Sequence, residues 1–96
     1  MTQKEKLYYL IKGYYVGNYN AKSFSEQFVI IFSEGIEDYS NKNERKIMQE
    51  FCKLAERYSP YDEDLKMSSF FIDDESFRVL FNQLYDNFIA KQISFS

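Results

Sequence analysis

Apolar residues recur at helical spacing in four separate segments of this chain. In the first segment they stand three and four residues apart, which is the spacing of one helix face, and lysine and glutamate fill most of the other side. Gly17 follows at the position where helices often stop. The pattern predicts a helix over residues 2–16. Its buried face carries Leu7, Leu10, Ile11 and Tyr14.

The second segment predicts a helix over residues 21–33 that ends before Gly35. Asn20 and Ser23 are both candidate N-caps, and Ser23 with Glu26 has the S-x-x-E spacing of a capping box. The apolar face is wide, so we expect this helix to be the most enclosed of the four. That face carries Phe24, Phe28, Val29, Ile30, Ile31 and Phe32.

The third segment predicts a helix over residues 41–58. Asn41 is a suitable N-cap and Glu44 follows it three residues later. Pro60 stands where the helix could not continue. The apolar positions of this segment are Ile47, Phe51, Leu54, Ala55 and Tyr58.

The fourth segment predicts a long helix that begins at Asp73 and ends near Ile93. Asp73 is the expected N-cap, and Ile72 and Phe77 have the spacing of a hydrophobic staple around it. Before this helix the periodicity fades, apart from a single turn over residues 62–66. The apolar stripe carries Phe77, Leu80, Phe81, Leu84, Phe88 and Ile89.

No alternating run of β-branched residues competes with these helices, so we expect an all-α protein without a sheet. Four amphipathic helices with short connections are typical of an antiparallel four-helix bundle. The length of 96 residues suits one such bundle, which predicts a single domain over residues 1–96. In this layout Glu56, at the end of the third helix, would lie near the carboxylates of the following loop.

The composition argues against an enzyme. The chain has no histidine and one cysteine, and no GxGxxG, GxxxxGK[ST], CxxC or HExxH motif occurs. Cys52 falls on the apolar side of the third helix, which indicates a buried small hydrophobe. We therefore expect no catalytic residues, no metal and no cofactor. The chain opens without a leader pattern and its apolar runs are too short to span a bilayer, so we expect a cytoplasmic protein.

Negative charge is concentrated between the third and fourth helices. Residues 56–75 carry seven carboxylates and two cations, a net charge of −5, whereas the rest of the chain is net +2. Residues 62–64 resemble the start of a calcium loop, but Lys66 and Met67 stand where an EF-hand needs an oxygen ligand and a glycine. Calcium is therefore disfavoured.

We interpret the acidic stretch as a docking surface for a cationic protein. Glu56 lies in the last turn of a helix, where the helix dipole disfavours an anion, and a function would explain that cost. Tyr58, Tyr61 and Phe70 or Phe71 could supply apolar anchors. The patch would repel phosphate, so nucleic acid is not expected as the direct ligand.

Asp73, Asp74 and Glu75 have a second explanation. All three stand in or beside the first turn of the fourth helix, where carboxylates stabilise the positive end of the helix dipole by about 0.3–1 kcal/mol each. Helix stability alone would account for them.

Two stretches make up most of this patch. They are Leu54-Ala55-Glu56-Arg57-Tyr58-Ser59-Pro60-Tyr61-Asp62-Glu63-Asp64 and Phe71-Ile72-Asp73-Asp74-Glu75, which leads into an amphipathic helix. Together they resemble the colicin D type immunity proteins, which include relatives that protect against contact-dependent growth inhibition toxins. The segment from Tyr15 to Phe32 is similar to the first hairpin of that family. The similarity covers about Leu7 to Phe88.

This resemblance implies a small four-helix bundle that binds the catalytic domain of a transfer-RNA-cleaving toxin and covers its basic active site. Glu56 matches an acidic inhibitory residue of the family. Ser59 stands where the colicin D immunity protein has an acid, and Tyr61 rather than an acid follows Pro60, so Asp62 and its neighbours substitute for the missing charges. The expected toxin-binding residues are Glu56, Tyr58, Tyr61, Asp62, Glu63, Asp64, Asp73, Asp74 and Glu75.

The expected partner is a toxin nuclease domain, with no membrane contact, and the free protein is expected to be a monomer. Two alternatives remain open. An immunity protein against a membrane-acting bacteriocin would also be a small helical bundle, but it would work through another surface. A non-catalytic adaptor bundle would use its aromatic surface, drawn from nine Tyr and ten Phe, for oligomerisation.

Overall fold

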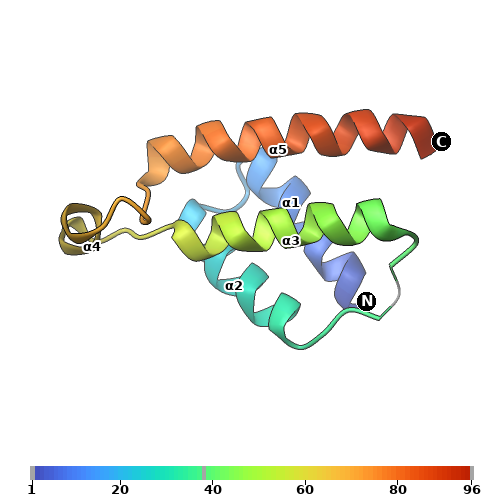
Figure 1. Cartoon of the computed structure of the whole chain (residues 1–96), viewed down its shortest axis with the longest axis horizontal. Helices are drawn as coiled ribbons and strands as arrows, with labels where there is room; N and C mark the ends of the chain where they lie inside the picture. Colours follow the sequence, from blue (N-terminus) through green and yellow to red (C-terminus); the bar gives the residue numbers. More distant parts are fainter. Residues whose placement is uncertain (1, 38, 96) are drawn as a thin grey trace.

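A computed structural model describes residues 2–37 and 39–95, with side chains described as far as Phe88. This part of the chain contains no strand, so the predicted all-α class is confirmed. Its helices are α1 (Gln3–Tyr15), α2 (Ala21–Ser33), α3 (Lys42–Arg57), α4 (Asp62–Met67) and α5 (Asp74–Phe95) (Figure 1).

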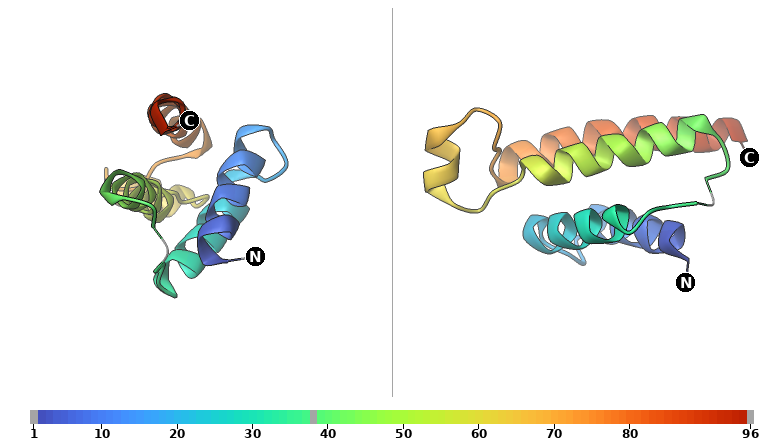
Figure 2. Two further views of the ribbon diagram at one scale, coloured as in Figure 1. Left: turned by 90° about the vertical axis from the view of Figure 1, so that its right-hand side faces the viewer. Right: turned by 60° about the horizontal axis from the view of Figure 1, so that its bottom comes forward.

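The four long helices form an antiparallel bundle made of two crossed hairpins. Helices α1 and α2 run in opposite directions, as do α3 and α5 (Figure 1). Figure 2 shows α3 and α5 nearly end-on in its left view, with the α1–α2 pair tilted across them. The described ends of the chain lie at one end of the bundle and α4 lies at the other. The predicted bundle is confirmed, and the single turn expected at residues 62–66 is the short helix α4.

Helix α2 has the predicted bounds, and the structure decides between its two candidate N-caps. Asn20 caps it, because the Asn20 side chain accepts a hydrogen bond of 2.8 Å from the amide of Ser23. Ser23 therefore lies inside the first turn, and the capping box predicted for Ser23 and Glu26 is wrong. The expectation that α2 is the most enclosed helix is also wrong, because α2 has four buried residues, whereas α1, of the same length, has five.

The other predicted caps are confirmed. The side chain of Asn41 accepts from the amide of Glu44 at 2.9 Å, and that of Asp73 accepts from the amide of Ser76 at 2.9 Å. Helix α3 ends at Arg57, one residue before the predicted end, because the next residue has extended backbone.

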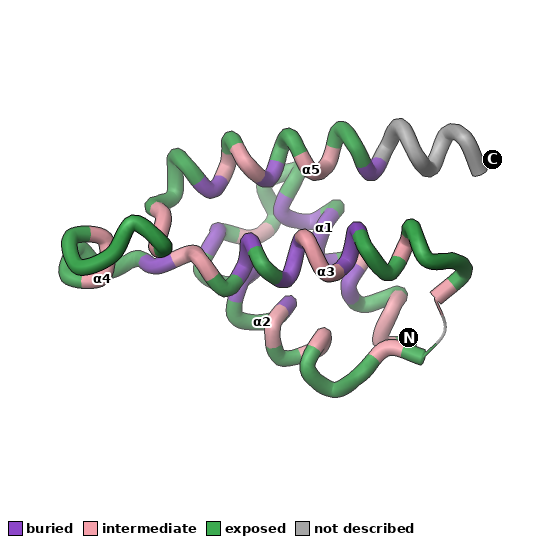
Figure 3. Tube along the Cα trace, in the orientation of Figure 1, coloured by how far each residue is buried: buried purple, intermediate pink, exposed green. Residues whose placement is uncertain are grey.

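The core is a cluster of aromatic rings contributed by all four long helices. Tyr14 of α1 joins it, with ring centroids 4.6 Å from Phe81 and 5.4 Å from Phe24. Burial of each such ring stabilises the fold by about 1.5–3 kcal/mol. Figure 3 shows the buried residues on the facing sides of the helices. The fully buried rings are Phe24, Phe28, Phe51, Phe77 and Phe81. The predicted apolar positions Ile89 and Ile93 lie outside the residues whose side chains are described.

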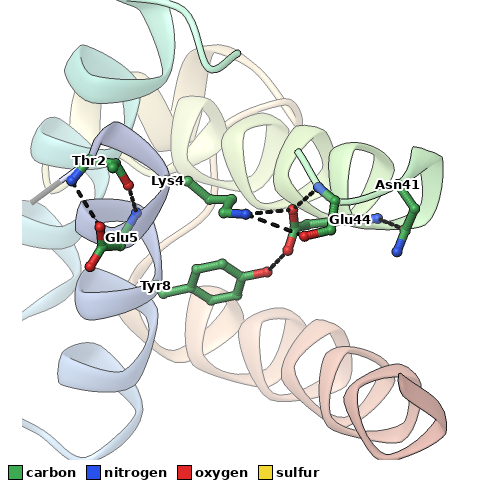
Figure 4. Close-up of polar contacts among 7 residues, drawn as sticks. Thr2, Lys4, Glu5, Tyr8, Asn41 and Glu44 are labelled. Carbon is green, nitrogen blue, oxygen red and sulfur yellow. Dashed lines mark hydrogen bonds and ion pairs between the residues drawn. The ribbon is translucent and has the colours of Figure 1, made fainter. Parts of the chain in front are cut away.

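A polar cluster joins the start of α1 to the start of α3, at the opposite end of the bundle from α4 (Figure 4). The Tyr8 hydroxyl donates a hydrogen bond to the carboxylate of Glu44, and Lys4 lies 3.4 Å from the same carboxylate. The amide of Ser40 donates to it at 2.7 Å. A partly buried carboxylate with this many donors fixes the first hairpin against the second.

Candidate functional site: the α4 loop

The connection between α3 and α5 is a loop closed at its base. The amide of Ser59 donates to the carbonyl of Ile72 at 3.1 Å, and the amide of Ile72 donates to the carbonyl of Arg57 at 2.8 Å. These bonds form a parallel bridge between Tyr58 and Ile72. We call residues 58–72 the α4 loop. It projects past the ends of α3 and α5 and does not fold back along the bundle (Figure 1).

Ser59 organises the inside of this loop. The residue is 3% exposed, and its hydroxyl donates to Asp64 at 2.7 Å and accepts from the amide of Tyr61 at 3.2 Å. The resemblance places an acid at this position in the colicin D immunity protein, whereas here the serine is internal to the loop. Asp64 is held by this contact and is half-buried.

The outer side of the loop exposes both charged and large apolar side chains. Asp62 and Glu63 are exposed in the first turn of α4, where their charge also stabilises the short helix. Large apolar side chains are exposed on the same loop, with Tyr61 at 61%, Met67 at 84% and Phe70 at 49%. Exposed apolar area of this kind on a charged projection is typical of an interaction surface.

Tyr58 holds the loop to α5. Its ring packs against Phe77, with centroids 5.5 Å apart. Burial of the side chain, together with a hydrogen bond to Asp74, raises the pKa of the Tyr58 hydroxyl. Both Tyr58 and Asp74 were expected to bind a partner, and the structure gives each of them a contact within the chain.

Asp73 is the N-cap of α5. The hydrogen bond from the amide of Ser76 lowers the pKa of the Asp73 carboxyl. Glu75 is exposed in the first turn of the same helix. The arrangement at Asp73 matches the helix-stability explanation, whereas Glu75 lies open to solvent.

Glu56 is exposed in the last turn of α3. Its carboxylate accepts a hydrogen bond from the thiol of Cys52 at 3.6 Å. Cys52 is 6% exposed, which confirms its predicted burial. Burial, followed by the charge and hydrogen bond of Glu56, raises the pKa of the Cys52 thiol to about 12.

The cations of the acidic stretch do not neutralise it by pairing. Arg57 donates from Nε to the carbonyl of Phe70 at 2.9 Å, and its guanidinium lies 5.9 Å from the Phe70 ring centroid. Within the described side chains, neither Arg57 nor Lys66 forms an ion pair with a carboxylate. The negative charge of the loop therefore faces solvent.

The described residues contain no group of three or more acidic or cysteine side chains placed to hold a metal ion. The helices in the same part of the chain are all too short or too polar to cross a membrane.

Comparison of the chain with protein-family models, with curated proteins and with solved structures found no match.

A groove of about 400 Å³ separates the α4 loop from α2. Tyr61 and Asp64 line it from the loop, and Ser25 and Glu26 line it from α2. Reasoning from the sequence missed the two α2 residues. The available signal was Ser25 itself, a polar residue three places before Phe28 on an apolar helix face.

Proposed function

We propose that this chain is an immunity protein, a non-catalytic inhibitor that binds the nuclease domain of a toxin and covers its basic active site with the α4 loop. One observation carries the proposal: a loop closed at its base projects from the bundle and exposes carboxylates and large apolar side chains side by side. The similarity of residues 54–64 to colicin D type immunity proteins supports the choice of a transfer-RNA-cleaving nuclease as the partner.

The exposed carboxylates suit a cationic active site. Glu56, Asp62 and Glu63 are exposed and have no ion pair among the described side chains. A nuclease that binds transfer RNA presents cations to phosphates, and carboxylates would occupy the same positions. Opposite charge on the two surfaces also speeds the encounter and disfavours wrong partners.

The apolar side chains would keep the complex together. Tyr61, Met67 and Phe70 are exposed in the free chain, and covering them removes apolar area from water at about 25 cal/mol per Å². The closed base of the loop reduces the ordering that binding would otherwise require. Inhibition of this kind is steric and electrostatic, with no chemical step, and it would take place in the cytoplasm where transfer RNA is.

The proposal is tested by co-expressing the chain with the protein encoded beside it and purifying either one by affinity tag. A one-to-one complex that silences cleavage of total transfer RNA, while the partner alone cleaves it, is the expected result. A partner without nuclease activity, or a nuclease that neither binds the chain nor is inhibited by it, would overturn the proposal.

A further inference from the structure

The groove between α2 and the α4 loop contains a buried polar group without a partner. Ser25 is 5% exposed, and its hydroxyl oxygen makes no hydrogen bond within the described residues. Buried polar groups are nearly always paired, because leaving one unpaired costs free energy. Since Ser25 lines the groove, a ligand in the groove would be placed to supply the missing partner.

The walls of the groove combine apolar surface with negative charge. Val29 of α2 and Tyr61 and Phe71 of the α4 loop supply apolar and aromatic surface. Glu26 and Asp64 supply two carboxylates, and Lys22 supplies one cation, so the lining carries a net charge of −1. One oxygen of Asp64 accepts from Ser59, and its other oxygen accepts no hydrogen bond from the described residues.

We propose that this groove receives an arginine side chain of the bound nuclease, an inference that rests on the proposed function. An arginine has an apolar stem, which the groove walls would cover, and a planar cation with five donors, which would bond the two carboxylates and the Ser25 hydroxyl. The flat guanidinium also stacks on aromatic rings such as Tyr61. Lysine fits less well, because its compact ammonium is strongly hydrated and cannot stack.

The groove lies beside the exposed carboxylates of α4, so one basic surface would reach both. Asp64 belongs to the loop that carries Asp62 and Glu63, and its side chain lines the groove. An arginine seated between α2 and the loop would therefore anchor the same partner that the outer side of α4 attracts.

The test is an NMR titration of the full chain with Nα-acetyl-arginine amide, with Nα-acetyl-citrulline amide as a neutral compound of nearly the same shape. We expect saturable amide shifts confined to residues 22–30 and 58–64, with a dissociation constant on the order of millimolar. The citrulline compound should bind at least about tenfold more weakly, because charge-assisted hydrogen bonds are lost.

Two variants separate the groove from the general negative charge of the protein. Ser25→Ala keeps the charge and removes the unpaired hydroxyl, so it should leave the fold intact and weaken arginine binding by roughly three- to tenfold. Ser23→Ala changes an exposed serine that does not line the groove and should leave binding unchanged. Glu26→Gln should weaken arginine binding without weakening that of citrulline.

Shifts spread over the whole surface, equal binding of citrulline and arginine, or unchanged binding to Ser25→Ala would each overturn the inference. A failure of the arginine inference can be told apart from a failure of the proposed function. A nuclease complex that forms without arginine binding in the groove overturns only this inference, whereas arginine binding without any nuclease complex overturns the assigned partner and leaves the arginine site standing.

Discussion

The amide of Ser59 donates a hydrogen bond to the carbonyl of Ile72, and this bond of 3.1 Å closes the base of the α4 loop. The return bond from Ile72 reaches the last residue of α3, so the loop is fixed to the bundle on both sides. Because the loop is already held in place, a partner that binds its charges pays less conformational entropy than it would to order a free chain.

Replacing Ser59 by alanine should loosen the α4 loop without unfolding the bundle. The change removes the hydroxyl that bonds both Asp64 and the amide of Tyr61, at a cost of about 0.5–1.5 kcal/mol for each bond. Amide hydrogen exchange in residues 59–72 should accelerate by roughly tenfold, while exchange in α1 and α2 stays unchanged. Ser69→Ala, an exposed change in the same loop, is the control. Equal exchange in both variants would contradict the role given to Ser59.

The effect of Gly13→Ala on stability should depend on the residue at position 19. The change should destabilise the protein that has Tyr19 and stabilise a variant that lacks the Tyr19 ring. A Cβ at Gly13 would lie 2.2 Å from the ring of Tyr19, so the ring must move, at about 1–3 kcal/mol. Over most of that range the cost exceeds the roughly 1 kcal/mol that alanine gains over glycine within a helix. The variant should therefore melt several degrees below the parent.

In a Tyr19→Ala background the same Gly13→Ala change should raise the melting temperature, because only the helix preference remains. Thermal unfolding followed by circular dichroism measures all four proteins of this cycle. A rise in both backgrounds would show that the ring does not press on Gly13.

Much of the fold could be predicted because its signals are local. Apolar periodicity placed the four long helices, and the caps at Asn41 and Asp73 depend on residues three positions away. At α2 the local signal was ambiguous, since Asn20 and Ser23 both stand at suitable positions. Spacing alone does not choose between them.

The site was predictable only in part because its contacts are long-range. The sequence shows where the carboxylates lie, and the exposure of Asp62 follows from a polar loop. It does not show that Asp74 is held by Tyr58, because that contact needs the loop to close. Ser25 and Glu26 meet the α4 loop only when α2 packs against α3, so a polar residue on the apolar face of α2 is the one local sign of the groove and does not show what lies opposite it.

Acid should destabilise the protein through carboxylates whose pKa is lower in the folded state. Burial by itself would raise the pKa of Glu44, but hydrogen bonds from Tyr8 and Ser40 and the charge of Lys4 outweigh it and hold the pKa below 4.5. The unfolded chain therefore takes up the proton first as the pH falls. The contribution of the Glu44 carboxylate to the stability of the fold is present above about pH 4.5. It is lost as the pH falls through the folded-state pKa of Glu44.

Urea unfolding at several pH values between 7 and roughly 3 checks this. Glu44→Gln should lower the free energy of unfolding at pH 7 by about 1–3 kcal/mol, since a charge-assisted contact is lost, and should flatten the decline in acid. Glu37→Gln, an exposed change, should leave both unaltered. If the free energy of unfolding falls equally steeply with pH in the parent and in Glu44→Gln, Glu44 is not a source of the acid sensitivity.

The Cys52 thiol should be unreactive in the folded protein. Burial and the neighbouring Glu56 raise its pKa to about 12, so almost no thiolate exists at neutral pH. Alkylation by iodoacetamide at pH 8 should be at least about a hundredfold slower than in urea-unfolded chain. Glu56→Gln should speed it only modestly, because burial is the larger cause. Rapid alkylation of the native protein would mean that the end of α3 opens.

The most direct test of the central claim is inhibition of transfer-RNA cleavage by a variant whose charge is reversed at the end of α3 and on the α4 loop. The variant Glu56→Lys with Asp62→Lys should need at least about a hundredfold higher concentration for half-inhibition than the parent, with the melting temperature little changed. The matched control is Glu37→Lys with Asp86→Lys, two exposed carboxylates outside the loop with the same change in net charge. The account predicts that this control inhibits like the parent. Full inhibition by the loop variant, or equal loss in both variants, would contradict it.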